Sequence, residues 1–415
     1  MTGLVDCNNF FVSCERTRNP ALEGRPVVVL SNNDGCVVAR SNEAKALGIK
    51  MGQPAFQIRD LIDAGAVIAL SGNHLLYRDL SIKVHAIFHR YAPSAIDYSV
   101  DEAFLDMTGI PTVALREIGR NIVEACDREL HLPVTIGFAP TKTLAKIVTE
   151  LCKKRGRRVG ILMSAADAEG LLDSFPIGEL WGIGRRLAKR LYSSGVYTAG
   201  DLRRSTRSAV RDSMGVNGEK IWNELNGIPC IELSHVGRDV QDSISETRTF
   251  PEDVIDFDFM RTKISIYASS CARRLRAMKS VCGRVAVFMR TNRFHTDTPY
   301  LRPGTEIVLP VPSSDTQTIV AAALQGLRRI WLPRVPMKRA GVILSDITSP
   351  EALQPSLFDA PSQSASTSEL MRIIDSINTV PGAPKLRLAN QLTDLRRPSG
   401  NDGYSSSFQA PREGR

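Results

Sequence analysis

The chain has 415 residues, too many for one compact core and enough for three or four modules of ordinary size. Its 53 lysines and arginines exceed its 44 aspartates and glutamates, and the net charge of +9 has the sign expected of a protein that rests on a polyanion. The first residues lack a basic start followed by an apolar run, and no other apolar stretch approaches about 18 residues, so a cytoplasmic protein with no membrane contact is expected. Eight scattered cysteines contain no C-x-x-C pair, which indicates reduced thiols and argues against a zinc knuckle or a disulfide framework.

The N-terminal part of the chain alternates between apolar strand patterns and helical patterns. The expected strands are 2–6, 26–30, 95–100, 102–107 and 133–138, and the expected helices cover about 112–130 and the region from about 141. The strands 95–100 and 102–107 meet around Ser99–Asp101. This alternation predicts strands and helices arranged around one sheet.

The stretch LWGIGRRLAKRL (180–191) places a Gly-x-Gly turn between short helical patterns, so a small helical module is expected over about 165–235. Further elements follow, namely strands at 243–250, 284–291, 305–311 and 339–347 and helices at 260–278 and 319–330. Their order predicts a ferredoxin-like split βαβ unit with helices on one face of the sheet. From about 349 the composition is rich in Ser, Pro and Gln, which is typical of a linker, and one short helix near 367–378 is expected.

Three carboxylates stand at strand ends. Asp6 ends the first strand, whereas Asp101 and Glu102 stand where two predicted strands join. If these strands are neighbours in one sheet, the carboxylates converge, and such a cluster suits hard divalent cations that also bind substrate phosphates. The same residues are equally compatible with a turn aspartate and a solvated hairpin, and spacing alone does not decide between the two interpretations.

Longer motifs point to a known family. DCNNFFVSCE (6–15) and YSVDEAFLD (98–106) are similar to the two metal-binding motifs of Y-family translesion DNA polymerases. The stretches SNNDGCVVARSNEAKALGIKMG (31–52), IGFAPTKTLAKI (136–147) and LWGIGRRLAKRL resemble the UmuC subfamily, the catalytic subunits of bacterial DNA polymerase V. The likeness runs from residue 2 to about 390, with five motifs in the same order.

The resemblance implies an α+β multidomain fold of the right-hand polymerase type. Its expected parts are a palm at 1–165 with fingers inserted at about 19–74, a helix-hairpin-helix thumb at 166–236, a ferredoxin-like little finger at 240–348 and a flexible tail at 349–415. Its implied activity is error-prone translesion synthesis in the SOS response to DNA damage. The sequence lacks a second carboxylate-rich module of the kind that a proofreading exonuclease requires, which agrees with low fidelity.

The resemblance also implies roles for single residues. Asp6, Asp101, Glu102 and the carbonyl of Cys7 would hold two divalent metal ions, most naturally Mg²⁺, and Phe11 would be a steric gate that collides with a ribose 2′-hydroxyl. The other implied nucleotide-binding residues are Phe10, Arg40, Asn42, Lys45 and Lys146. Asn42 and Lys45 depart from archaeal members, which have Tyr and Arg there, and Lys lacks the bidentate geometry of Arg.

Contacts to primed or damaged DNA are expected from basic residues in both halves. The paired glycines of the 180–191 motif would let backbone N–H groups approach a phosphate, with positive charge around them. The expected DNA-binding residues are Gly182, Gly184, Arg185, Arg186, Lys189, Arg284 and Arg290. The basic runs at 153–158 (KKRGRR) and 203–211 are weak candidates for further contacts, because such runs are more often solvated than bound.

The tail and the family suggest protein partners. QPSLFD (354–359), with Gln354, Leu357 and Phe358, resembles the peptide that binds the sliding clamp. A processed UmuD-like dimer and a RecA filament are partners by resemblance. Two alternatives remain: a catalytically weak DNA-binding or regulatory protein of the same architecture, and another palm-type nucleotidyltransferase such as a cyclase.

Overall fold

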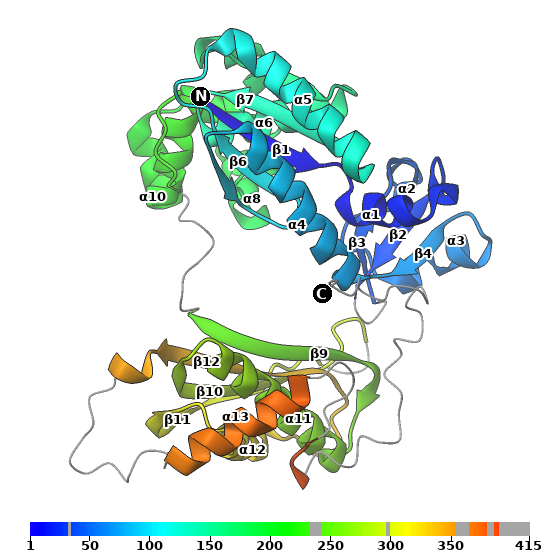
Figure 1. Cartoon of the computed structure of the whole chain (residues 1–415), viewed down its shortest axis with the longest axis vertical. Helices are drawn as coiled ribbons and strands as arrows, with labels where there is room; N and C mark the ends of the chain where they lie inside the picture. Colours follow the sequence, from blue (N-terminus) through cyan, green and yellow to red (C-terminus); the bar gives the residue numbers. More distant parts are fainter. Residues whose placement is uncertain (32–34, 233–241, 296–298, 353–364, 380–385, 390–415) are drawn as a thin grey trace, which may run out of the picture. The chain divides into compact units, whose positions relative to one another are not determined.

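The computed structural model describes residues 1–31, 35–232, 242–295, 299–352, 365–379 and 386–389, and only the backbone at 365–368 and 379. The described residues up to 232 form one compact unit, and those from 242 onward form a second one (Figure 1). No helix in these ranges combines the length and apolar character needed to cross a membrane. The clamp-binding prediction at Gln354, Leu357 and Phe358 lies outside the described residues.

A five-stranded sheet with the order β5-β6-β1-β7-β8 forms the centre of the first unit. Its strands are β1 (Thr2–Cys7), β5 (Ser94–Asp97), β6 (Glu102–Asp106), β7 (Val134–Ala139) and β8 (Val159–Ile161). The central strand β1 pairs antiparallel with both β6 and β7. The strands predicted around Asp6 and on both sides of Ser99–Asp101 are therefore confirmed as neighbours in one sheet.

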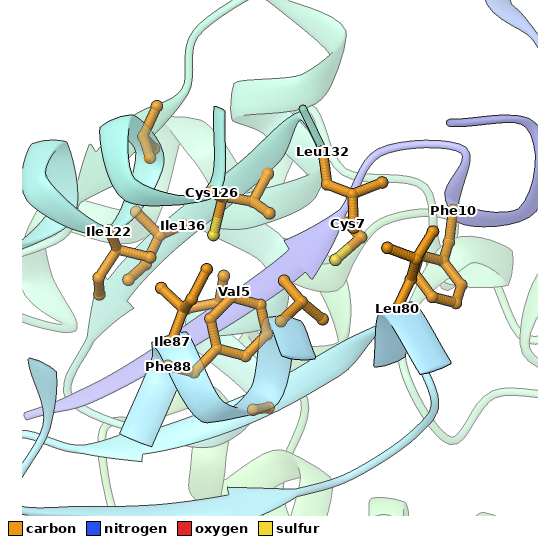
Figure 2. Close-up of a cluster of buried hydrophobic side chains, with 14 of the residues drawn as sticks. Val5, Cys7, Phe10, Leu80, Ile87, Phe88, Ile122, Cys126, Leu132 and Ile136 are labelled. Carbon is orange, nitrogen blue, oxygen red and sulfur yellow. The ribbon is translucent and has the colours of Figure 1, made fainter. Parts of the chain in front are cut away.

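Side chains of β1 alternate between two hydrophobic cores, because successive residues of a strand point to opposite faces. Val5 and Cys7 face the helices α4 (His74–Tyr91) and α5 (Thr112–Leu130), and Figure 2 shows both side chains within that cluster. Leu4 packs on the other face with α6 (Lys142–Lys154). Asp6 shares the face of Leu4, so the sheet presents this carboxylate to α6.

The strand predicted at 26–30 belongs to a different sheet, which corrects the expectation of one sheet in the N-terminal part. Strand β2 (Val27–Leu30) pairs with β3 (Val37–Arg40) and β4 (Ile68–Ser71) in a three-stranded sheet. The reason is a separate small core: Val28 and Leu30 pack with residues of this segment, such as Ile49 and Ile58, rather than with β1. The neighbouring helices are α1 (Phe10–Arg18), α2 (Asn42–Ala46) and α3 (Arg59–Asp63).

The helical module predicted at about 165–235 is confirmed. It contains α7 (Glu169–Asp173), α8 (Arg185–Ser193), α9 (Ala199–Arg204) and α10 (Arg207–Leu225). Its buried side chains share one core with α6 and with Leu4 and Phe104 of the sheet, so the module is anchored to the face that carries Asp6. Gly182 has a φ of +88°, and a Cβ there would lie 2.7 Å from Ile221, which explains the glycine in this turn.

The second unit has the element order that the sequence predicted. It runs β9 (Ser243–Val254), α11 (Phe257–Ala277), β10 (Val281–Arg290), β11 (Gly304–Ser313), α12 (Thr316–Ile330) and β12 (Met337–Thr348). The sheet order is β11-β10-β12-β9, so β12 separates the two strands that α11 joins, and the βαβ unit is split. Both helices pack on one face of the sheet with Val285, Val287 and Met289.

The short helix predicted near 367–378 is also confirmed, as α13 (Ala365–Thr379). It packs on the second unit through the buried Met371 and through an ion pair between Arg276 and Asp375 at 2.7 Å.

Candidate active site

The register of β1 and β6 brings two of the three predicted carboxylates together. Asp6 is the direct cross-strand partner of Glu102. Opposite residues of an antiparallel pair point to the same face, with Cβ atoms about 5 Å apart. The pKa of Asp6 is raised to about 7, chiefly by burial and also by the adjacent carboxylate of Glu102, whereas the charge of Lys153 lowers it. The two acids therefore form one electrostatic unit.

Asp101 is fixed beside this pair by the turn between β5 and β6. The Ser99 hydroxyl donates a hydrogen bond to the Asp101 carboxylate at 2.6 Å, and the backbone N–H of Cys7 donates to the Asp101 carbonyl at 2.9 Å. Burial raises the pKa of Asp101, and the charge of Glu102 raises it as well. The side chain of Cys7 points into the opposite core, so only its backbone lies on the side of the carboxylates (Figure 2).

Two lysines of α6 neutralise the acids. Lys146 donates to both oxygens of Glu102 at 2.9 and 3.0 Å, and Lys153 forms an ion pair with Asp6. The two lysines are seven residues apart, about two helical turns, so they lie on the same side of α6. Lys153 belongs to the basic run at 153–158, in which solvated side chains were the usual expectation, but its side chain is 24% exposed and is paired with Asp6.

Aromatic side chains surround the ammonium group of Lys146. It lies 4.8 Å from the ring centroid of Tyr98, 5.5 Å from that of Trp181 and 5.9 Å from that of Phe104. The Trp181 indole N–H also donates to the Tyr98 hydroxyl at 3.0 Å. The helical module thus reaches the sheet through Trp181, a contact that sequence analysis did not predict.

The carboxylates of Asp6, Asp101 and Glu102 fit hard divalent cations, because Mg²⁺ prefers oxygen ligands. Positive charge also offsets the cost of placing negative charges away from water. Among the residues that the structure describes, however, no three His, Cys, Asp or Glu side chains converge closely enough to hold a metal ion. The backbone places the three acids side by side as predicted, whereas the side chains of Asp6 and Glu102 are turned to Lys153 and Lys146.

Phe11 lies in the first turn of α1, where aromatic stacking holds its ring in place. Its ring is stacked on Tyr77 at a centroid distance of 4.3 Å and meets His74 edge to face at 5.9 Å. The Tyr77 hydroxyl donates to Glu15 at 2.7 Å, which fixes the supporting ring. Phe10 is 3% exposed and packs in the core. The Phe10 side chain therefore lies in the core, and the backbone of Phe10 remains available for the predicted nucleotide contact.

The predicted phosphate-binding residues Asn42 and Lys45 lie on α2, and Arg40 ends the strand β3 just before it. The Asn42 side chain accepts hydrogen bonds from Asn9 at 3.1 Å and from Lys45 at 3.2 Å. Burial lowers the pKa of Lys45, and the positive charges of Arg40 and Lys153 lower it further, whereas Asp6 raises it. The guanidinium of Arg40 donates to the carbonyl of Ile49. Arg40 and Lys45 from one segment and Lys153 from another thus form one cationic rim.

The predicted DNA-binding residues lie on the surface of the two units. Gly184 caps α8, and Arg185, Arg186 and Lys189 are exposed around its N-terminus. In the second unit, Arg284 and Arg290 share the exposed face of β10, as predicted, while Val285, Val287 and Met289 pack inward. Arg284 forms an ion pair with Glu306 at 2.7 Å.

Comparisons with known proteins agree with this architecture. Residues 5–150 match the model of the impB/mucB/samB family, and residues 241–357 match that of the impB/mucB/samB family C-terminal domain. Protein UmuC of Salmonella typhimurium is 36% identical over 395 residues, which cover 94% of this chain and 93% of that protein. DNA polymerase IV of Desulfatibacillum aliphaticivorans is 29% identical, with 95% of this chain and 97% of that protein covered.

A solved structure supports the fold. A Y-family DNA polymerase chimera superposes with a TM-score of 0.67 at 23% identity, covering 84% of this chain and 99% of that one. The chain therefore belongs to the impB/mucB/samB family and has the fold of a Y-family DNA polymerase.

Proposed function

We propose that the chain is an error-prone translesion DNA polymerase that extends a primer across damaged template in the response to DNA damage. The observation that carries the proposal is the placement of Asp6 opposite Glu102, with Asp101 fixed beside them and Lys146 and Lys153 facing them. Membership of the impB/mucB/samB family supports it, as do the printed names of relatives that are DNA polymerases.

The three acids would hold the metal ions of the reaction. Asp6, Asp101 and Glu102, with the Cys7 carbonyl, supply hard oxygen donors, and Mg²⁺ is the ion that suits them best. Two bound divalent cations would promote attack of a primer 3′-oxygen on the α-phosphate and stabilise the leaving pyrophosphate. Lys146 and Lys153 orient the carboxylates of Glu102 and Asp6, because each ammonium group forms an ion pair with one of them.

The cationic rim would bind the triphosphate of a deoxynucleotide. Lys45, Arg40 and Lys153 gather their charges near Asp6, and the first N–H groups of α1 have no partner within the helix. Such N–H groups and ammonium groups both favour phosphate oxygens. Phe11, stacked on Tyr77, would lie beneath the sugar and exclude a ribose 2′-hydroxyl by collision.

The parts of the chain are assigned accordingly. Residues 1–165 would be the palm with fingers at about 19–74, residues 166–236 the thumb, residues 240–348 the little finger and residues 349–415 a tail. Duplex DNA would contact Gly182, Gly184 and the exposed basic side chains of α8. It would also contact the exposed face of β10. Such an enzyme would act on DNA in the cytoplasm.

The test is single-nucleotide extension of a primed template with MgCl₂. Asp101→Ala is expected to lower the rate by about a hundredfold or more, because it removes a preorganised charge at the reacting phosphate. Asp106→Ala is the matched control, since Asp106 is an exposed acid at the other end of β6 that binds only Thr108. Extension by Asp101→Ala at the wild-type rate would contradict the role of the acids, and absence of extension by the wild type would favour a catalytically inert DNA-binding protein.

Protein partners are proposed from the tail and from the family. A sliding clamp would bind Leu357 and Phe358, and a UmuD-like dimer and a RecA filament would assist synthesis. The double variant Leu357→Ala with Phe358→Ala should lose stimulation by the clamp and keep its extension rate without the clamp. Equal loss of extension with and without the clamp would contradict the proposal that the tail binds the clamp.

A further inference from the structure

Two ring-bearing side chains of α4 contact the ring of Phe11. Tyr77 is stacked on it with a centroid distance of 4.3 Å and an interplanar angle of 13°, and His74 meets it at 5.9 Å and 86°. His74 and Tyr77 are three residues apart on one helix, so their side chains lie on the same face of α4. Phe11, His74 and Tyr77 thus form one aromatic triad.

The distances place His74 at the side of the stacked pair. Its ring centroid is 5.9 Å from that of Phe11 and 5.8 Å from that of Tyr77. A position over the outer face of either ring would make one of these distances longer than the other by a stacking distance. The face of Phe11 that points away from Tyr77 is therefore not the face that His74 covers.

A stacked ring and a ring at the side restrain different motions. Tyr77 opposes motion of Phe11 along the normal of its ring, but stacked rings slide over each other easily because their attraction is spread over the whole face. A ring that stands upright at the side of the stack opposes sliding in its own direction. His74 therefore restrains the lateral position of Phe11, which Tyr77 alone leaves loose.

The imidazole is held by the turn that precedes α4. Asn73 caps the helix, and its side chain accepts a hydrogen bond from the Leu76 N–H at 3.1 Å. A Cβ at Gly72 would lie 3.2 Å from Nε2 of His74 and 3.0 Å from the Leu30 carbonyl oxygen, so the imidazole lies against the bare backbone of this glycine. The glycine backbone and the stacked rings together confine a side chain that is otherwise exposed.

We propose that His74 is a positioning residue that sets where the Phe11 ring meets the sugar of the incoming nucleotide and so helps to discriminate dNTP from rNTP. The inference rests on the proposed function, in which Phe11 excludes a ribose 2′-hydroxyl. Exclusion by collision depends on position, because a ring that shifts sideways makes room for one added oxygen. Loss of the lateral restraint should therefore admit ribonucleotides without impairing the use of deoxyribonucleotides.

The test compares primer extension with dNTP and with rNTP by the full chain. His74→Leu and His74→Gln both remove the ring, the first keeping apolar bulk and the second keeping polarity. In each variant the ratio of kcat/KM for dNTP to kcat/KM for rNTP should fall about fivefold, the factor that one edge-to-face ring pair contributes. The value for dNTP should stay near that of the wild type.

Two further variants make the comparison specific to the ring. His74→Phe keeps a ring at the side of the stack and should retain the wild-type ratio. His89→Leu is the matched control, because this histidine lies on the same helix but is paired with Asp97 at 3.0 Å and does not belong to the triad. Its ratio should not change.

A double-mutant cycle separates positioning from a purely structural role. In the Phe11→Ala background there is no ring to position, so His74→Leu should not lower the ratio further. A side chain that contacts the nucleotide directly, or that only stabilises the fold, would act to the same extent with and without the Phe11 ring. Urea denaturation checks that each variant is folded.

Three results would overturn the inference. These are an unchanged ratio in both variants that lack the ring, an equal fall in His74→Phe, which would assign the effect to the imidazole nitrogens, and an additive effect in the Phe11→Ala background. The proposed function is judged separately, by dNTP extension with the wild type. A wild type that extends the primer while the His74 variants keep its ratio contradicts this inference alone, whereas a wild type that extends no primer overturns both.

Discussion

Lys146 donates two hydrogen bonds to the carboxylate of Glu102 at 2.9 and 3.0 Å, and its ammonium group is enclosed on the other side by three aromatic rings. Both side chains are only 18% exposed, so water competes weakly for this ion pair. Trp181, from the turn before α8, supplies one of the rings and a hydrogen bond to Tyr98. A residue of the helical module thus helps to orient Glu102.

Changing Trp181 is therefore expected to alter catalysis as well as stability. Trp181→Phe keeps a ring over Lys146 and loses the hydrogen bond to Tyr98, which should lower the free energy of unfolding by about 1 kcal/mol. Trp181→Leu also loses the cation–π contact, which contributes about 1 kcal/mol more, and should slow single-nucleotide extension further. Urea denaturation and extension kinetics measure the two effects.

Trp222→Phe is the control for this comparison. Its indole N–H donates to the backbone carbonyls of Arg203 and Ser205, within the same helical module but away from the carboxylates. This variant should lose stability and keep the wild-type rate of extension. If Trp181→Leu and Trp222→Phe slowed extension equally, the rings around Lys146 would have only a structural role.

Phe11 should decide between deoxyribonucleotides and ribonucleotides. Phe11→Ala removes the ring that is stacked on Tyr77, so the preference for dNTP over rNTP, measured as the ratio of kcat/KM values, should fall at least about tenfold. Tyr77→Phe keeps the stack and loses only the hydrogen bond to Glu15, and it should retain most of the preference. A preference unchanged in Phe11→Ala would show that another side chain is the gate.

Glu15 gives the protein a pH-dependent stability. Burial raises the pKa of Glu15, although the hydrogen bond from Tyr77 and the charge of Arg18 lower it. A carboxyl with a raised pKa in the folded state binds its proton more tightly than in the unfolded state. Stability from this group is therefore full below the unfolded pKa and decreases as pH rises through the folded pKa.

Glu15→Gln should remove this dependence. The amide oxygen still accepts from the Tyr77 hydroxyl, so the variant should be more stable than the wild type at neutral pH and no more stable at acid pH. Urea denaturation at a series of pH values measures the difference. Glu23→Gln is the control at a carboxyl that is 66% exposed, and a steeper pH dependence in Glu15→Gln would contradict the assignment.

The sequence predicted most strands and helices and placed the three acids at strand ends, because strand patterns and helical periodicity are local signals. The strands that pair with β2 were not predictable, because a run of valines indicates a strand but not the sheet to which the strand belongs. The difference between Phe10 and Phe11 depends on where α1 begins, after Asn9 with its left-handed φ of 49°. The hydrogen bond between Trp181 and Tyr98 joins residues 83 positions apart, and no local sequence pattern predicts it.

Lys153 and Lys154 offer a matched pair of neighbouring lysines on α6. Lys153 is paired with Asp6, whose side chain is 15% exposed. Lys154 is paired with Glu179, and both of these side chains are more than 40% exposed. With divalent cations at Asp6, the ammonium group of Lys153 would be able to contact the triphosphate instead. Lys153→Ala should therefore raise the KM for the incoming dNTP about tenfold, because one charge-assisted hydrogen bond is lost.

Lys154→Ala should change neither KM nor kcat, and its stability should remain within about 1 kcal/mol of the wild type, as is usual for an exposed ion pair. Lys153→Arg is the informative third variant, because it keeps the charge and changes its geometry. A KM restored by arginine would assign Lys153 to phosphate binding. If Lys153→Ala lowered kcat without raising KM, its role would be to orient Asp6 and not to bind the nucleotide.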